Sequence, residues 1–322
     1  MKPIISKKEI NLAVLGMVDL NGHPYSWSAI VNGYNKDLMA DCPYPVIPKY
    51  LGQRPAEDFG IPGVKVTHIW TDDPEDAKKV AAASKIENVV SRPEDVIGEV
   101  DAVLIPTDKG FEHVERCRKF VEAGIPMFVD KPLADTIEDL NVFIDWVNHG
   151  AAILSSSCNR YAKNLIPYHK GHNCEIGQLR FIYSPQPKTW ERYGIHGLES
   201  IYPMTGPGYL TVQNTGSYGR DVVHLTHKDG IDVVLTNMYD AASAGIFLSG
   251  TDGVIRPGPG ATFESFKGQL VSYINYLRTG ERPFPFSETV EMIKIISAGI
   301  LSKNEGGKKI VLDDLKVSEV KE

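Results

Sequence analysis

A lysine that directly follows a short apolar run is the first residue of this chain with the means to act on a substrate. The string AGIPMFVDKPLADT, residues 123–136, has Val129 and Asp130 at the end of that run, followed by Lys131 and Pro132. In an α/β domain the carboxyl end of a strand opens into the ligand crevice. A lysine there can orient a hydroxyl group or favour its alkoxide electrostatically. Without further context, however, Asp-Lys-Pro is also a common strand-exit turn.

A second candidate is the glycine-containing stretch GMVDLNGHPYSW, residues 16–27, which follows the apolar residues 12–15. Such a turn between a strand and a helix can present backbone amides to a phosphate. The G-x-G-x-x-G pattern of dinucleotide-binding turns is incomplete, because Val18 occupies the place of the second glycine and Gly22 comes one residue late. The stretch is a damaged turn, a modified one or an ordinary strand-to-helix connection.

The composition limits the classes of protein to consider. The 322 residues carry a net charge of −7, with 42% apolar and 23% charged residues, which is typical of a globular chain of two domains. The negative charge argues against nucleic acid or an anionic membrane as the main partner. Four scattered cysteines form no C-x-x-C pair, and no apolar run approaches a membrane span. We therefore expect a cytoplasmic protein.

The first half alternates short apolar runs with helical patterns, which predicts a Rossmann-type doubly wound parallel sheet. The expected strands are residues 11–16, 64–70, 87–90, 101–106, 126–130 and 151–156, and the expected helices are 24–34, 74–84, 110–123 and 135–149. Residues 35–63 contain five prolines and little periodicity. We interpret them as an insertion that carries substrate contacts, a subunit interface, a lid or only a surface excursion.

The second half predicts an α+β domain with an open, mainly antiparallel sheet. Expected strands lie at 179–185, 221–230, 231–239 and 244–257, with a helix at 195–204, two long amphipathic helices at 263–280 and 287–306, and a last strand before the tail. We place the domain boundary between residues 155 and 156, giving domains 1–155 and 156–322. Because one face of an open sheet must be covered, we expect a homodimer or homotetramer.

Several histidines are candidate metal ligands. His169, His172 and Cys174 lie close together in YHKGHNCEIG, but a fourth ligand is missing nearby. His224 and His227 are three residues apart in a strand-like segment, so they point to opposite faces. We predict no metal site.

The string around Lys131 resembles that of the Gfo/Idh/MocA oxidoreductases, the family of glucose–fructose oxidoreductase and inositol 2-dehydrogenase. The corresponding family segment reads A-G-x-x-V-x-x-[ED]-K-P-L-A, with the lysine in the active site. The segments IPTDKGFEHVERCRKFVEAG, SSCNRYAKN, EIGQLRFIY, GTDGVI and FESFKGQLVSYINYLRTGERP extend the likeness in order along nearly the whole chain. The resemblance implies that Asp130 and Lys131 lie at the cofactor, with Thr107 near the nicotinamide.

The string TWERYGIHGLESIY, residues 189–202, resembles the family's D-x-G-x-H-x-x-D helix. The resemblance makes His196 the proton acceptor, with Glu199 in place of the last aspartate and Arg192 in place of the first. A guanidinium there disfavours the imidazolium formed during oxidation. Arg192 either binds the carboxylate of an acidic substrate or marks a chain that has lost the usual reaction. The predicted substrate-binding residues are Arg160, Arg192 and Glu199, and the catalytic pair is Lys131 and His196.

The cofactor implied by the resemblance is NAD, with NADP left open. Aligned to the family, the acid that takes the adenosine ribose falls on Thr71, with Asp72 next to it and no basic residue beside it for a 2′-phosphate. We interpret residues 16–27 as a modified dinucleotide turn, in which Pro24 begins the helix and nearby amides face the pyrophosphate. The predicted cofactor contacts are Gly16, Val18, Gly22, His23, Tyr25, Ser26, Thr71, Asp72, Thr107, Asp130 and Lys131.

The sequence therefore predicts an NAD(P)-dependent oxidoreductase that acts on a sugar, cyclitol or related polyol or sugar acid. Two alternatives stay open. One is an enzyme that retains NAD and uses transient oxidation for isomerisation or eliminative glycoside cleavage. The other is a non-catalytic protein that binds NAD or a sugar.

Overall fold

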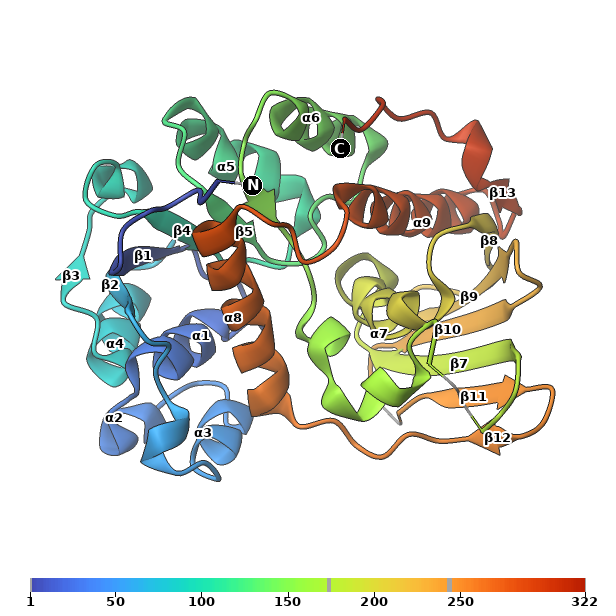
Figure 1. Cartoon of the computed structure of the whole chain (residues 1–322), viewed down its shortest axis with the longest axis horizontal. Helices are drawn as coiled ribbons and strands as arrows, with labels where there is room; N and C mark the ends of the chain where they lie inside the picture. Colours follow the sequence, from blue (N-terminus) through green and yellow to red (C-terminus); the bar gives the residue numbers. More distant parts are fainter. Residues whose placement is uncertain (1, 173–174, 242–244, 322) are drawn as a thin grey trace.

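The first half of the chain forms a six-stranded parallel sheet in a computed structural model that describes residues 2–172, 175–241 and 245–321 (Figure 1). The strand order β3-β2-β1-β4-β5-β6 is that of a doubly wound dinucleotide-binding sheet, which confirms the predicted fold. The strands are β1 (Ile10–Leu15), β2 (Val64–Trp70), β3 (Asn88–Val89), β4 (Ala102–Ile105), β5 (Met127–Val129) and β6 (Ile153–Leu154).

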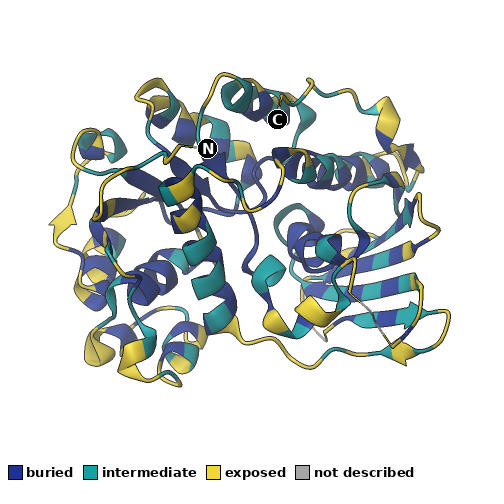
Figure 2. Ribbon diagram, in the orientation of Figure 1, coloured by how far each residue is buried: buried dark blue, intermediate teal, exposed yellow. Residues whose placement is uncertain are grey.

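Helices connect these strands as the alternating pattern predicted. They are α1 (His23–Asn32), α4 (Pro74–Ser84), α5 (His113–Glu122) and α6 (Ile137–Asn148), with short 3-10 turns at Pro93–Val96 and Gly110–Glu112. Asp73 accepts a hydrogen bond from the amide of Glu75 at the start of α4, and Thr136 accepts one from Asp139 at the start of α6. Strands β4 and β5 are buried along their whole length, because helices cover both faces of the sheet (Figure 2).

The proline-rich insertion forms two short helices, α2 (Lys36–Ala40) and α3 (Val46–Leu51), and a 3-10 turn at Ala56–Asp58. Its helix α2 packs against α4, and its helix α3 packs against α8 (Thr262–Thr279), which follows the second sheet in sequence but lies beside α1 in space (Figure 1). Arg54 forms an ion pair with Glu264, and Lys267 donates to the Asp58 carbonyl at 2.5 Å. The insertion is therefore a packed layer on the first half.

The second half forms a seven-stranded mixed sheet, in the order β12-β11-β7-β10-β9-β8-β13, in which β7 and β10 are parallel and the other neighbours antiparallel. The expected strand at 244–257 is a hairpin of two strands, and a strand at residues 209–214 was missed. The strands are β7 (Leu179–Pro187), β8 (Tyr209–Asn214), β9 (Arg220–His227), β10 (Asp232–Met238), β11 (Phe247–Gly250), β12 (Val254–Ile255) and β13 (Ile310–Val311).

Two helices cover one face of this sheet, α7 (Ile195–Thr205) and α9 (Phe286–Asn304). His224 is half-buried and His227 is buried, as expected for two residues that lie three positions apart in β9 and so face opposite sides of the sheet. Cys174, considered above as a metal ligand, lies outside the described residues. Within the described ranges, no helix combines the length and the apolarity that a membrane span requires.

Trp190 anchors the segment that leads into α7. It begins a π-helical turn, Trp190–Gly194, and its indole is fully buried. The indole Nε1 donates to the Ile296 carbonyl of α9 at 2.9 Å. Glycines leave the space for the ring, since a Cβ at Gly299 would lie 2.3 Å from Nε1 and a Cβ at Gly194 would lie 2.5 Å from Cε3.

We predict that Gly299→Ala destabilises the protein by about 1–3 kcal/mol, because the added methyl group overlaps the Trp190 indole and the packed helix cannot move away freely. The gain in helix propensity from alanine offsets only part of this cost. Urea unfolding of both proteins measures the difference. Gly258→Ala is the matched control, because a Cβ there meets no atom within 4 Å. Equal stabilities of Gly299→Ala and the control would contradict the anchoring role of Trp190.

Candidate active site

Lys131 lies at the carboxyl end of β5, where Val129 brings the chain out of the sheet. The residue is 1% exposed, and its Nζ has no hydrogen-bond partner. The nearest carboxylate to this ammonium is Asp108, whose Oδ2 lies 3.6 Å away. Burial alone would lower the pKa of Lys131, but Asp130 and Asp108 raise it above its ordinary value. Lys131 is therefore a buried ammonium group with its donors unused.

Asp108 connects Lys131 to Arg192. Its Oδ1 accepts a hydrogen bond from Arg192 Nη2 at 2.5 Å, and the carboxylate is 1% exposed. Burial alone would raise the pKa of Asp108, but Lys131 and Arg192 lower it to about 2. Arg192 also donates to the backbone carbonyl of Asp19 at 2.9 Å. The guanidinium predicted to bind substrate is thus bonded across the two halves of the protein.

His196 lies in the first turn of α7 and is 8% exposed. Its Nδ1 is 2.6 Å from Ser157 Oγ, and its ring lies 4.6 Å from the Tyr193 ring in an edge-on arrangement. Burial and then the positive charges of Lys131, His23 and Lys188 hold the pKa of His196 well below its ordinary value. The imidazole is therefore neutral near neutral pH and able to accept a proton.

Glu199 and Arg160 lie behind His196 and are bonded to each other. Arg160 also donates to Glu288 at 2.8 Å, and Glu199 accepts the amide of Ser157 at 3.0 Å. Both are predicted substrate-binding residues. In the structure their charges are paired within the second half, because buried charges must be paired. Their link to the site runs through Ser157, which contacts His196.

The turn after β1 reaches across the ends of β4 and β5. Asn21 donates to the Pro106 carbonyl at 3.0 Å, and His23 Nδ1 is 2.6 Å from Asp130 Oδ2. The turn also meets the second half, because Lys188 Nζ donates to the Leu20 carbonyl at 3.0 Å. Asp19 forms an ion pair with Lys109 at 2.7 Å. The enlarged turn therefore borders the site of Lys131.

The start of α1 is less open than the sequence suggested. A Cβ at Gly22 would lie 2.5 Å from Tyr44 Cδ2 and 2.5 Å from Ile47 Cδ1, so Gly22 makes room for the insertion. Tyr25 and Ser26 are buried, and the Ser26 amide donates to the Gly22 carbonyl at 3.2 Å. Gly22 is predicted to let a pyrophosphate come close to the backbone. In the structure, the side chains that lie close to Gly22 are Tyr44 and Ile47 of the insertion.

The adenosine end of a dinucleotide site is better formed. A pocket of about 230 Å³ lies between the ends of β1, β2 and β4, with Leu15, Trp70, Ile105 and Arg116 among its lining residues. At Gly16, with φ +107°, a Cβ would lie 2.9 Å from Thr107 Cγ2 and 3.0 Å from Arg116 Nη1. The backbone there requires glycine, as a close-packed phosphate turn does.

Asp72 is the acid at this end. Its Oδ2 accepts the amide of Met17 at 3.1 Å, and its Oδ1 accepts Arg116 Nη2 at 2.8 Å. Thr71, the position aligned with the family acid, is buried and donates to the Asp73 carbonyl at 2.5 Å. Asp72 is therefore better placed than Thr71 to accept ribose hydroxyls. Arg116, which sequence analysis did not identify, is the basic residue beside it.

Two other predicted cofactor contacts are buried. Val18 is 9% exposed, within the turn. Thr107 is fully buried beneath Gly16, and its Oγ1 lies 3.1 Å from His113 Nε2. Its side chain thus supports the turn from below.

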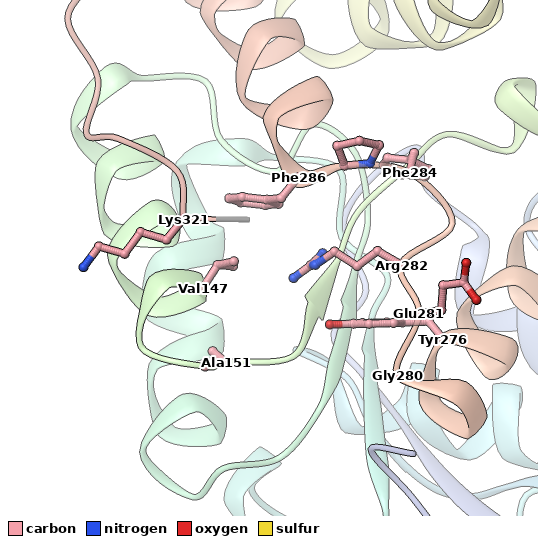
Figure 3. Close-up of a pocket in the computed structure, with 11 residues that line it drawn as sticks. Val147, Ala151, Tyr276, Gly280, Glu281, Arg282, Phe284, Phe286 and Lys321 are labelled. Carbon is pink, nitrogen blue, oxygen red and sulfur yellow. The ribbon is translucent and has the colours of Figure 1, made fainter. Parts of the chain in front are cut away.

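A separate pocket of about 480 Å³ lies at the amino end of β6, between α6 and the connection from α8 to α9 (Figure 3). Its lining includes Arg282, which donates to the Ile153 carbonyl at 2.8 Å and lies over the rings of Tyr276 and Phe286. Because the predicted site residues follow the carboxyl ends of the strands, this pocket is at the opposite edge of the sheet and contains none of them.

Sequence analysis missed three residues that shape the site. Tyr193 lies with its ring centre 4.8 Å from Lys131 Nζ. Ser157 contacts His196, and Asp108 contacts Lys131. Of these three, Asp108 has a signal in the sequence, because its negative charge is opposite to that of Arg192, which stands in place of a family aspartate.

The comparisons with known proteins agree with the fold of the chain. Residues 48–156 match the model of an oxidoreductase family with an NAD-binding Rossmann fold, Gfo/Idh/MocA. The match begins after the modified turn. A search of curated protein sequences finds no match to the chain.

Solved structures of low sequence identity share the fold over nearly the whole chain. Myo-inositol 2-dehydrogenase from Lactobacillus plantarum has a TM-score of 0.73 at 17% identity, covering 94% of this chain and 99% of that one. A myo-inositol dehydrogenase from Corynebacterium glutamicum has a TM-score of 0.69 at 18% identity, with coverages of 94% and 99%. An Agrobacterium radiobacter oxidoreductase, solved with NAD+, L-tartaric acid and magnesium, has a TM-score of 0.72 at 14% identity, with coverages of 96% and 100%. Residues 48–156 are therefore similar to the NAD-binding segment of the Gfo/Idh/MocA oxidoreductases, and the whole chain shares the fold of these solved dehydrogenases.

Proposed function

We propose that this protein oxidises a carbinol group of a sugar, cyclitol or related polyol, or reduces the corresponding ketone. The observation that supports this best is that the side chains of Lys131 and His196 both contact the ring of Tyr193. Lys131 Nζ is 4.8 Å from the centre of the Tyr193 ring, and the His196 ring centre is 4.6 Å from it. A buried ammonium and a neutral imidazole, supplied by the two halves of the chain, can together act on one hydroxyl.

In the direction of oxidation, Lys131 donates a hydrogen bond to the substrate hydroxyl oxygen and stabilises the developing alkoxide. His196 accepts the hydroxyl proton at Nε2, with its Nδ1–H donating to Ser157 Oγ. Ser157 Oγ also accepts the amide of Asn159 at 3.1 Å, which fixes its lone pairs toward these donors. Bound NAD would supply the hydride acceptor for the carbinol carbon. Asp130 and Asp108 keep Lys131 charged throughout.

The residues present fit NAD at its adenosine end. The pocket beside Trp70 would hold the adenine, Asp72 would accept the ribose hydroxyls, and Gly16 would leave the backbone room beside the pyrophosphate. The turn leads from there toward Asp130 and Lys131, which would hold the nicotinamide end. Val18 and His23 are proposed contacts along this path.

We expect Lys131→Met and His196→Gln each to lower kcat by about 10²–10⁴-fold, because each removes a group that acts on the hydroxyl. NAD binding, measured by titration, should stay near the wild-type value, which also shows that the variants fold. Lys78→Met is the control, since Lys78 is exposed on α4. Full turnover by Lys131→Met on an identified polyol would contradict the proposed mechanism. Failure of the purified protein to bind NAD at all would contradict the proposed function.

The Asp108–Arg192 pair predicts a specific double-mutant result. Arg192→Asp alone puts two carboxylates side by side and should lower both turnover and stability. The double variant Arg192→Asp with Asp108→Asn has no such repulsion. It keeps one carboxylate, at position 192 in the second half. We expect the double variant to recover activity, with a coupling energy of about 0.5–3 kcal/mol in a double-mutant cycle. Additive losses in kcat/KM would show that the two residues act independently.

The cofactor preference depends on Asp72. We expect Asp72→Asn to weaken NAD binding by about tenfold or more, because hydrogen bonds to a charged group are worth roughly 1.5–3 kcal/mol. The same change frees Arg116 to pair with a 2′-phosphate, so NADP binding should improve relative to NAD. Asp72→Asn with Arg116→Leu is the matched control and should lose that improvement. If Asp72→Asn leaves the ratio of the Kd for NAD to the Kd for NADP unchanged, Asp72 does not contact the ribose.

We also propose that the protein self-associates, as a homodimer or homotetramer, through the face of the second sheet that α7 and α9 leave open. Along β7 and β10, Ile182 and Val233 are buried, whereas their neighbours Phe181, Tyr183 and Val234 on the other face are half-buried. A sheet face with aromatic and branched side chains gains stability when a second copy covers it.

A further inference from the structure

Lys188 is a basic residue of the site that neither the family pattern nor the proposed mechanism uses. It follows β7 and precedes the turn that carries Arg192 and Tyr193. Its ammonium group donates to Tyr193 Oη at 2.7 Å and to the Leu20 carbonyl at 3.0 Å, and lies 4.2 Å from the Tyr193 ring centre. The side chain is half-buried, so the ammonium lies at the edge of the site rather than in bulk solvent.

The partners of Lys188 set it apart from the other cations around the site. Lys131 and Arg192 share the carboxylate of Asp108, and Lys109 pairs with Asp19. Lys188 has no carboxylate within 4.0 Å among the described residues and is bonded only to neutral oxygens. A carboxylate or phosphate is a stronger partner for an ammonium group than a carbonyl oxygen, since a charge-assisted hydrogen bond is roughly twice as strong.

The backbone around this contact is also unusual. Lys188 has φ +59° and Leu20 has φ +61°, in the left-handed region that residues other than glycine rarely adopt. The two residues come from opposite halves of the chain and meet through the bond from Nζ to the Leu20 carbonyl. Left-handed residues of this kind cluster at ligand sites, where the surrounding structure holds them.

A second, buried group points to the same ligand. Lys131 Nζ has no hydrogen-bond partner, although an ammonium has three donors. Because Lys131 Nζ and Lys188 Nζ lie 4.8 and 4.2 Å from the centre of one ring, they are at most about 9 Å apart. One sugar-sized molecule can therefore place a hydroxyl on Lys131 and an anionic group on Lys188.

We propose that Lys188 binds an anionic group of the substrate, so that the enzyme acts on a polyol or sugar bearing a carboxylate or a phosphate. This inference rests on the proposed function and narrows its substrate class. The anion replaces the Leu20 carbonyl as the partner of Lys188. It also places a negative charge near His196, whose pKa is held down by burial and by neighbouring cations, and so makes this imidazole a stronger base in the substrate complex.

The test uses matched pairs that differ only in charge. With saturating NAD, binding is measured by titration for aldonates against their alditols, beginning with D-gluconate and D-glucitol, and for D-glucose 6-phosphate against D-glucose. We expect the acids of at least one series to bind about tenfold or more tightly than their neutral counterparts, as one charge-assisted bond gives. The carboxylate and phosphate series separate the two sources of charge.

Lys188→Met should abolish the preference for the acid while leaving NAD binding and the affinity for neutral polyols unchanged. Lys170→Met is the control, because Lys170 is an exposed lysine paired with Asp229. If NAD binds and acids bind no better than their neutral counterparts, or if Lys188→Met keeps the preference, the inference is overturned. Loss of NAD binding by the unmodified protein is a different result, which overturns the proposed function itself.

Discussion

The buried carboxylate of Asp108 is the constraint on which the arrangement of the site depends. A lysine that is 1% exposed cannot stay charged without an anion nearby, because the cost of removing an ammonium from water is several kcal/mol. Asp130 and Asp108 supply that negative charge, and Arg192 in turn balances Asp108. Lys131, Asp108 and Arg192 form a chain of charges from β5 through the β4 exit to the second half. Asp108 thus helps to keep Lys131 charged and also bonds the two halves of the protein together.

This chain of charges explains why the candidate active site needs residues from both halves of the protein. Lys131 and Asp108 come from the parallel sheet, whereas Tyr193, Arg192 and His196 come from the turn and helix that Trp190 fixes against α9. The second-half residues are held by packing, through an indole with no spare volume around it. Charge therefore aligns the halves, and packing sets how accurately His196 faces Lys131.

The sequence predicted helices and strands well where apolar residues recur with a strong period. It predicted side-chain contacts poorly where the two residues are far apart in the chain. Strands β1 and β2 and helices α1 and α4 lie within two residues of their predicted bounds, because apolar patterns and helix caps are local. Strand β8 was missed, since alternation in six residues is a weak signal. The roles of Arg160 and Glu199 depend on Glu288, which is 128 residues from Arg160 and invisible to any local pattern.

The modified turn shows how a familiar sequence position can acquire new contacts. Gly16 packs closely on Thr107 and Arg116, and Asp72 accepts the amide of Met17, so the proposed adenosine end keeps a glycine and an acid beside each other. Beyond Met17 the turn is longer than a G-x-G-x-x-G turn. Gly22 adjoins the insertion, while the Asp19 and Leu20 carbonyls accept hydrogen bonds from Arg192 and Lys188. The turn therefore borders the proposed substrate site as well as the proposed cofactor site. It does so through contacts with the second half of the chain, which a short glycine pattern does not encode.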